Sequence, residues 1–335
     1  MSLAKVVAVV GAIVAIEVAV LLIIKPPLTV KSVEVTDIKL TAPIGMPDFH
    51  YPAIKISFKA DKYPVKFQLM KVVESYVPNP SEEVAYLAIG GSRENIAEPR
   101  SYVVRAIIDN KEVFKREINL RGLSGSVRIL NASITTYSGL VPEPMIEKIL
   151  IKVENSGDVP LYLAYSSPPP LLSVDGASLF FKPSKEIIMP GSEEEVELSI
   201  TPIYPDKEHV FTILVPGIGI SSYTTEPLRP EVRVENVGLR PNYPIGSRSA
   251  TPVGYFLDNV TITVRNTEAY PISFLHHFEV YVGDKKATVL PSYVFLNPGE
   301  KRTLTIGCDL YVEKKPSEVR VKLYGTEVTY RVPEG

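Results

Sequence analysis

Short segments in which apolar and polar residues strictly alternate follow residue 27 along the chain. Clear examples are residues 54–60, 148–154 and 260–265. A period of two places every second side chain on the same face, so these segments predict half-buried antiparallel β-strands. The sequence after residue 24 carries no sustained helical period. Its 30 prolines also argue against a mostly helical protein, because proline removes a backbone donor and breaks helix interiors.

The strand pattern recurs at an interval of roughly 100 residues, which indicates an internal repeat. Residues 151–160 (IKVENSGDVP) and 262–271 (ITVRNTEAYP) share Ile, Val, Asn and Pro at identical spacing. A turn and then a Pro-Gly pair follow in both copies, and a fainter, shorter copy starts near residue 54. The matching turns are residues 174–176 and 282–284, and the matching Pro-Gly pairs are residues 190–191 and 298–299.

Each repeat reads as a set of short strands separated by turns. Asn155 and Asn266 end strands, where a side-chain amide can cap the turning backbone. Each Pro-Gly pair ends one strand and opens the next. About seven short strands with turns every 8–12 residues are typical of a β-sandwich.

The second and third copies resemble immunoglobulin-like modules of the CARDB (cell-adhesion-related) type from bacteria and archaea. Those modules carry "V-x-N-x-G", "V-D-G" and "L-x-P-G-E", and this chain has residues 153–157 (VENSG), 174–176 (VDG) and 296–300 (LNPGE). The resemblance implies an immunoglobulin-like fold. The first copy lacks the "V-D-G" turn and has a shorter interval between Pro64 and Pro80.

The repeat predicts three immunoglobulin-like sandwiches and the boundaries between them. They span residues 28–122, 123–227 and 228–335, and short linkers at 123–125 and 228–230 join them. Linkers that are short and contain proline predict a semi-rigid rod.

An apolar segment precedes the repeats. Residues 6–24 are apolar except for Glu17, and such a helix would be about 28 Å long, close to the ~30 Å hydrocarbon core of a bilayer. The segment has no convincing cleavage site, so we interpret residues 1–27 as an uncleaved transmembrane signal-anchor. The predicted fold class is therefore all-β, with tandem immunoglobulin-like β-sandwiches preceded by one N-terminal transmembrane helix.

Two readings of this helix remain open. In one, it is a plain anchor and Glu17 is protonated. In the other, a stripe of small residues packs against another copy of the helix or against another membrane or envelope protein, with Glu17 inside the contact. The candidate helix-association residues are Ala8, Gly11, Ala15, Glu17 and Ala19.

The N-terminal outline is also similar to type IV and archaeal pilins, which have a hydrophobic helix with a Glu and then a β-rich head. The resemblance implies cleavage after Gly11 and assembly of the helix into a filament core. Lys5 is the one charged side chain before Gly11, whereas the pilin leader is positively charged.

Two Asn-x-Ser/Thr sequons lie in the predicted sandwiches. They are Asn131-Ala132-Ser133 and Asn259-Val260-Thr261. As candidate glycosylation sites they favour an extracellular location for the β domains, with the chain as a single-pass protein of the cell membrane.

The sequence contains neither a recognisable catalytic motif nor a recognisable metal-binding motif. His276 and His277 would point to opposite faces of a strand, which disfavours shared metal binding. Cys308 is in phase with a predicted strand and is interpreted as a small core residue, and residues 193–195 (EEE) as a solvated turn. We therefore predict no enzyme activity, no cofactor and no metal.

Composition limits the partners and the source. A formal net charge of −2 gives no case for nucleic acid. One cysteine excludes an intrachain disulfide. Scarce Cys and Gln predict a heat-adapted, archaeal source.

The functional expectation is a membrane-anchored extracellular structural or adhesion protein that presents a rod of β-sandwich domains. The alternative is a pilin-like subunit of a surface filament or envelope assembly. An accessory subunit beside a membrane complex is a third hypothesis, which would need a polar pocket with convergent titratable residues.

Overall fold

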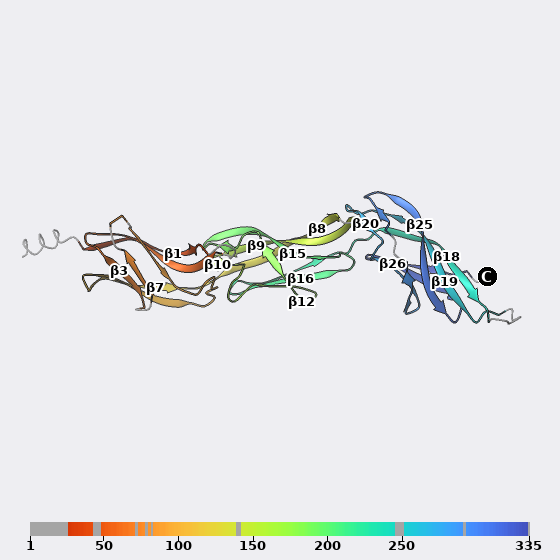
Figure 1. Cartoon of the computed structure of the whole chain (residues 1–335), viewed down its shortest axis with the longest axis horizontal. Coiled ribbons are helices and arrows are strands. Elements are labelled where there is room, and N and C mark those ends of the chain that lie inside the picture. The colour runs from red at the N-terminus through yellow and green to blue at the C-terminus, as the bar shows by residue number, and fades with distance from the viewer. Residues whose placement is uncertain are drawn as a thin grey trace, which may run out of the picture. The chain divides into compact units, whose positions relative to one another are not determined.

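The computed structural model describes residues 26–42, 48–70, 73–77, 80–81, 83–138, 142–244, 251–290 and 293–333. These residues form strands joined by turns and loops, and the described part contains no helix (Figure 1). The expected all-β character is confirmed. The predicted transmembrane helix falls on residues 1–25, which lie outside the described residues.

The chain divides into two compact units. Unit 1 contains the chain up to Gly125 with two later segments, Asn155–Pro169 and Ile187–Ser192. Unit 2 contains Ser126–Glu154, Pro170–Glu186 and the chain from Glu193 onward. The domain boundaries at 122/123 and 227/228 stay predictions.

Unit 1 is built on two antiparallel sheets, with strand orders β1-β2-β5 and β4-β3-β6-β7. Phe58 of β2 and Phe67 of β3 are completely buried, and their ring centroids are 4.8 Å apart. This contact places the core between the two sheets, an arrangement that fits a β-sandwich. The strands are β1 (Leu28–Leu40), β2 (Phe49–Ala60), β3 (Val65–Leu69), β4 (Val73–Val77), β5 (Val84–Ala88), β6 (Arg100–Ile108) and β7 (Lys111–Leu120), and a small sheet pairs β10 (Leu161–Tyr162) with β14 (Ile187–Ile188).

Unit 2 begins with two four-stranded sheets, in the orders β13-β15-β9-β8 and β12-β11-β16-β17. Alternate residues of β9 and β16 are buried, as the period of two predicts. The strands are β8 (Gly125–Ser138), β9 (Pro142–Asn155), β11 (Leu171–Val174), β12 (Ala177–Leu179), β13 (Phe181–Pro183), β15 (Ser192–Ile203), β16 (His209–Val215) and β17 (Gly219–Thr225).

The C-terminal part of unit 2 contains a further pair of sheets, in the orders β18-β19-β25-β23 and β22-β21-β26-β27. Val260 and Ile262 of one sheet share a buried cluster with Val280 and Val321 of the other. The strands are β18 (Glu231–Asn242), β19 (Gly254–Arg265), β20 (Ile272–Ser273), β21 (Phe278–Val282), β22 (Lys285–Lys286), β23 (Thr288–Val289), β24 (Phe295–Leu296), β25 (Lys301–Val312), β26 (Glu318–Leu323) and β27 (Thr326–Arg331), and β20 pairs with β24.

The strand order of the second copy is repeated in the third. The order β13-β15-β9-β8 corresponds to β23-β25-β19-β18, and β12-β11-β16-β17 corresponds to β22-β21-β26-β27. The small sheets β10-β14 and β20-β24 also correspond. The first copy keeps the order β4-β3-β6-β7 but has three strands in its other sheet, in agreement with its shorter sequence.

Asn155 caps the turn after β9 with both the nitrogen and the oxygen of its side-chain amide. Its Nδ2 donates to the carbonyl oxygens of Val159 (2.9 Å) and Ile188 (3.0 Å), and its Oδ1 accepts from the Gly157 N–H (3.2 Å). The residue is completely buried. These bonds satisfy backbone groups that the turning chain would otherwise leave unpaired.

Asn266 makes the same arrangement after β19. Its Nδ2 donates to the carbonyls of Tyr270 (2.8 Å) and Leu296 (2.9 Å), and its Oδ1 accepts from the Glu268 N–H (3.0 Å). It is also completely buried. The capping role predicted for both asparagines is confirmed, and each amide additionally holds the strand that precedes the Pro-Gly pair.

Candidate functional site

The predicted site residues fall in two groups. The five helix-association residues lie outside the described residues, so their role stays a prediction. Asn131 lies on β8 and Asn259 on β19, both within unit 2. The helix-association residues are Ala8, Gly11, Ala15, Glu17 and Ala19.

Asn131 is exposed, and other side chains engage its amide. Its Nδ2 donates to Ser133 Oγ at 3.4 Å, and its Oδ1 accepts from the Tyr223 hydroxyl at 3.5 Å. Both distances are long for hydrogen bonds. The amide therefore lies between β8 and β17, where a substituent on Nδ2 would displace these contacts.

Asn259 lies at the centre of a sheet and faces outward. The next residue, Val260, and Leu257 on the other side of a register shift are completely buried, whereas Asn259 is half-buried. Its direct partners on the adjacent strands are both glycines, Gly238 on β18 and Gly307 on β25. The amide of Asn259 lies over Gly238, where a Cβ would come within 2.7 Å of its Nδ2 and Oδ1.

The sheet face around Asn259 has polar and aromatic rows. On one side, the hydroxyls of Thr261 and Thr305 are 3.0 Å apart. On the other side, Phe256 pairs with Tyr311, with ring centroids 5.3 Å apart, and Arg240 stacks on Phe256 at 4.8 Å.

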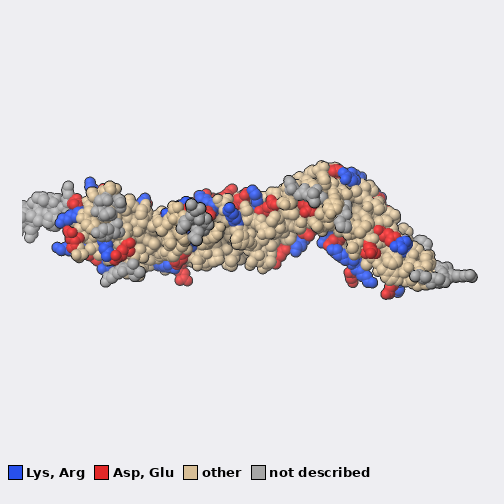
Figure 2. All heavy atoms as spheres, in the orientation of Figure 1, with Lys and Arg blue, Asp and Glu red and all other residues tan. Residues whose placement is uncertain are grey.

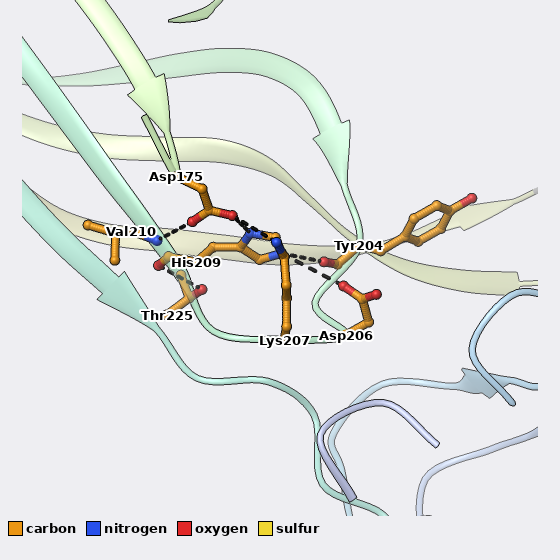
Figure 3. A network of polar contacts seen from close by, with 7 residues as sticks. All are labelled: Asp175, Tyr204, Asp206, Lys207, His209, Val210 and Thr225. Carbon is orange, nitrogen blue, oxygen red and sulfur yellow. Dashed lines mark hydrogen bonds and ion pairs between the residues drawn. The ribbon is translucent and has the colours of Figure 1, made fainter. Parts of the chain in front are cut away.

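Asp175 and His209 form a polar network at the turn between β11 and β12 (Figure 3). Asp175 Oδ2 is 2.9 Å from His209 Nδ1, and Asp175 Oδ1 accepts from the Val210 N–H at 3.0 Å. His209 Nε2 is 2.9 Å from the Tyr204 carbonyl oxygen. The Lys207 ammonium lies 3.1 Å from the same carboxylate.

This network contains a carboxylate and an imidazole, as an acid–base pair does, but the imidazole is not available to a substrate. Both ring nitrogens of His209 face oxygens of the chain, so both are already engaged. The Val210 N–H and then His209 and Lys207 lower the pKa of Asp175 to about 2. Neither nitrogen is open to a substrate. The hydrogen bonds of the network instead connect the turn between β11 and β12 to the segment before β16.

A second polar chain lies in unit 1. The Tyr162 hydroxyl donates to Asp37 Oδ1 at 2.8 Å, and Asp37 Oδ2 is 2.6 Å from His50 Nδ1. Burial, followed by the hydrogen bond to Asp37, raises the pKa of Tyr162. Tyr162 is completely buried, so its hydroxyl is not accessible to a substrate.

Arg93 and Asn95 hold the segment that follows Tyr162. The Arg93 guanidinium donates to the Ala164 carbonyl at 3.0 Å, and Asn95 Nδ2 donates to the carbonyls of Tyr162 and Pro168, each at 3.0 Å. Both side chains are almost fully buried. The proline-rich segment at residues 166–170 is therefore held in place at Pro168.

A shallow pocket of about 400 Å³ adjoins this cluster. Two of its charged lining residues, Glu94 and Arg100, pair with each other at 2.7 Å. Glu98, Ser167 and Pro168 also line the pocket. The described lining therefore contains one ion pair and one further carboxylate, that of Glu98.

Sequence reasoning missed these networks. Tyr162 and Asp37 are 125 residues apart, and no local pattern marks a contact between such distant residues. Asp175 was predicted only as part of the turn at residues 174–176, and no sequence pattern linked it to His209.

Two local predictions were wrong. His276 and His277 lie in a turn before β21, not in a strand, and their rings are 6.4 Å apart. Residues 193–195 lie in β15, not in a turn, because β15 pairs with β9 in the sheet; the Glu193 side chain lies 2.6 Å from Lys152 on that strand.

His277 and Cys308 are both buried. The His277 ring stacks on Tyr324, with centroids 4.4 Å apart, and meets the edge of Tyr204 at 4.7 Å. Its two nitrogens are buried and have no hydrogen-bond partner among the described residues. Cys308 is a core residue, as predicted, and burial raises the pKa of its thiol to about 11.

Charge and composition of the surface give no further site. Acidic and basic side chains are interspersed on the face shown in Figure 2. The described residues contain no group of three or more His, Cys, Asp or Glu side chains that could hold a metal ion. As far as the chain is described, no helix in it is long and apolar enough to cross a membrane.

Comparisons with known proteins were made for the whole chain. No protein-family model and no curated protein matches it. Among solved structures, it is similar to a crystal structure of a protein of unknown function from Porphyromonas gingivalis W83, with 13% identity, a TM-score of 0.19 and coverage of 60% of this chain and 99% of that chain. A likeness this low carries no inference about fold or function.

Proposed function

We propose that this chain is a membrane-anchored extracellular protein that presents immunoglobulin-like, CARDB-type β-sandwiches as a structural or adhesive surface element. Residues 1–27 serve as a single-pass anchor, and the sandwiches face outward. The scarcity of Gln and Cys supports a heat-adapted, archaeal source.

The observation that carries the proposal is the repeated asparagine cap. Asn155 and Asn266 make the same three hydrogen bonds in two copies of one sheet topology. A repeated structural device is expected in a chain that multiplies one module to gain length and surface. An enzyme needs a constellation of reactive groups that occurs at one place in the fold.

The polar networks support the same function. The polar side-chain atoms of His209, Asp37 and Asn95 form hydrogen bonds that hold turns or loops in place. Such bonds make the loops between strands rigid, which suits a protein that presents a fixed surface.

The anchor part of the proposal rests on sequence. Residues 6–24 are apolar except for Glu17 and are long enough to span a bilayer. The small-residue stripe of this helix provides a surface for association with another copy or with an envelope partner.

Surface labelling combined with N-terminal sequencing tests the proposal. We expect a membrane-impermeant label to reach the β domains on intact cells, the label to be spread over the envelope, and the N-terminus to be intact. A label confined to disrupted cells would contradict the proposal. Labelled filaments with a new N-terminus at Ala12 would instead establish the pilin-like alternative.

A further inference from the structure

We propose that Asn259 carries an N-linked glycan, and that the outer face of the sheet β18-β19-β25 is shaped to hold it. The inference rests on the proposed outward orientation of the sandwiches. It identifies one of the two sequons, Asn259-Val260-Thr261, as a built attachment site.

The strand geometry brings the acceptor and its hydroxyl together. Residues two apart in a strand share a face. Asn259 and Thr261 therefore lie on the same outward face of β19, and the buried Val260 between them points into the core. The Thr261 hydroxyl contacts only Thr305, at 3.0 Å, within the described residues.

The amide of Asn259 is open. No hydrogen bond to this amide is found among the described residues, in contrast to the amide of Asn131, which contacts Ser133 and Tyr223. A half-buried amide at the centre of a sheet would normally gain stability from a partner. Its unbonded state leaves Nδ2 free to take a substituent.

Glycines flank the acceptor on both neighbouring strands. The cross-strand partners of Asn259 are Gly238 and Gly307, and glycine is otherwise unfavourable within a strand. The missing side chain at Gly238 lets the amide of Asn259 lie over that strand, and the missing side chain at Gly307 leaves the space that Leu290 fills.

The side chains next to Asn259 on the same sheet face can contact a sugar. Phe256 and Tyr311 present aromatic rings, and Arg240 and Asp258 form an ion pair at 2.9 Å beside them. Aromatic rings pack against the C–H faces of sugars, while charged side chains bond to their hydroxyls. The first sugars of a glycan on Asn259 would meet these side chains.

The modification needs a co-substrate of one chemical class, a lipid-linked sugar phosphate or pyrophosphate. A membrane transferase would form the bond from Asn259 Nδ2 to the anomeric carbon and break the bond from that carbon to the phosphate oxygen. Nδ2 loses one proton, and the lipid phosphate or pyrophosphate leaves.

The test uses the full chain made in a host whose secretory pathway glycosylates such sequons. Trypsin separates the sites, because cleavage after Arg248 and Arg265 isolates Asn259, and cleavage after Arg128 and Lys148 isolates Asn131. We expect the peptide 249–265 to carry an oligosaccharide mass. Thr261→Val should abolish it, and Thr263→Val, one row away on the same face, should leave it unchanged.

A second pair of measurements separates the possible failures. Protease accessibility of the β domains is measured from outside intact cells of the same host. If the domains are accessible and peptide 249–265 is unmodified, the glycan is refuted and the proposed function stands. If the domains are inaccessible, both proposals fail. If glycan is found on peptide 129–148 alone, the assignment to Asn259 is refuted.

Discussion

At the scale of single residues, the buried polar side chains of this chain hold loops in place. In the described part of the chain His277 is an exception, because its ring lies between Tyr204 and Tyr324 and neither nitrogen has a hydrogen-bond partner there. A buried donor without a partner costs about 1–3 kcal/mol. We therefore expect the stability of the fold to depend on pH through His277.

Burial lowers the pKa of His277 from 6.5, because the charged ring would be poorly solvated. Below pH 6.5 the unfolded chain then binds more protons than the folded chain, so stability falls as the pH falls. We expect His277→Phe to remove this loss and to raise the free energy of unfolding at pH 7.5 by about 1 kcal/mol. The charged or titratable groups that face His277 are Glu143, Asp206, His276 and Glu279.

Denaturant titrations at pH 7.5 and pH 5 measure the effect of His277→Phe. The matched control is His276→Phe, since His276 is the exposed neighbour in the same turn. An identical pH dependence in the wild type and in His277→Phe would show that His277 does not titrate on unfolding.

Asp175 predicts an effect in a more acidic range. Its pKa is about 2 in the folded chain against 3.8 in the reference state, mainly because of the Val210 N–H. The carboxylate therefore contributes stability above pH 3.8, and this contribution is lost as the pH falls through 2. We expect Asp175→Asn to destabilise the protein by about 1 kcal/mol at pH 7, a modest value because the side chain is partly exposed.

Thermal unfolding of Asp175→Asn as a function of pH checks this prediction. The difference from the wild type should shrink below pH 3.8. Asp284→Asn is the control, because Asp284 occupies the corresponding turn of the third copy and is exposed. A difference that is constant down to pH 2 would mean that charge at Asp175 is not its cause.

At the scale of strands and turns, the two asparagine caps should matter equally. Replacing either by Asp removes both Nδ2 donors, leaves two carbonyls unpaired and buries a carboxylate. We expect Asn155→Asp and Asn266→Asp each to destabilise the unit that contains it by about 3 kcal/mol. The equality follows from their matching hydrogen bonds.

Chemical denaturation of the two variants, with the exposed Asn119→Asp as control, measures this effect. A loss at one position and none at the other would show that the caps are not equivalent. Loss in the control as well would point to a general effect of added negative charge.

The caps also show which elements could be predicted from the sequence. Alternation and the repeat gave the strands, since a period of two is a local property. The position of His276 and His277 in a turn and of residues 193–195 in a strand could not be inferred, because partners elsewhere in the chain determine both. The bond from Tyr162 to Asp37 was unpredictable for the same reason. In the candidate site, Asn259 and Thr261 could be predicted from the sequence motif. That Gly238 and Gly307 lie beside Asn259 could not be predicted, because it depends on the register of three strands.

At the scale of the whole molecule, the described cores involve strands from Leu28 onward. Leu28 at the start of β1 is already buried. We therefore expect a chain lacking residues 1–27 to be soluble and to unfold cooperatively. Its far-UV circular dichroism should show β structure, and its thermal transition should match that of the full chain in detergent. An unfolded or strongly helical truncated chain would refute the proposed architecture, whereas a folded chain that still partitions into membranes would place the membrane contact in the β domains and not in the N-terminal segment.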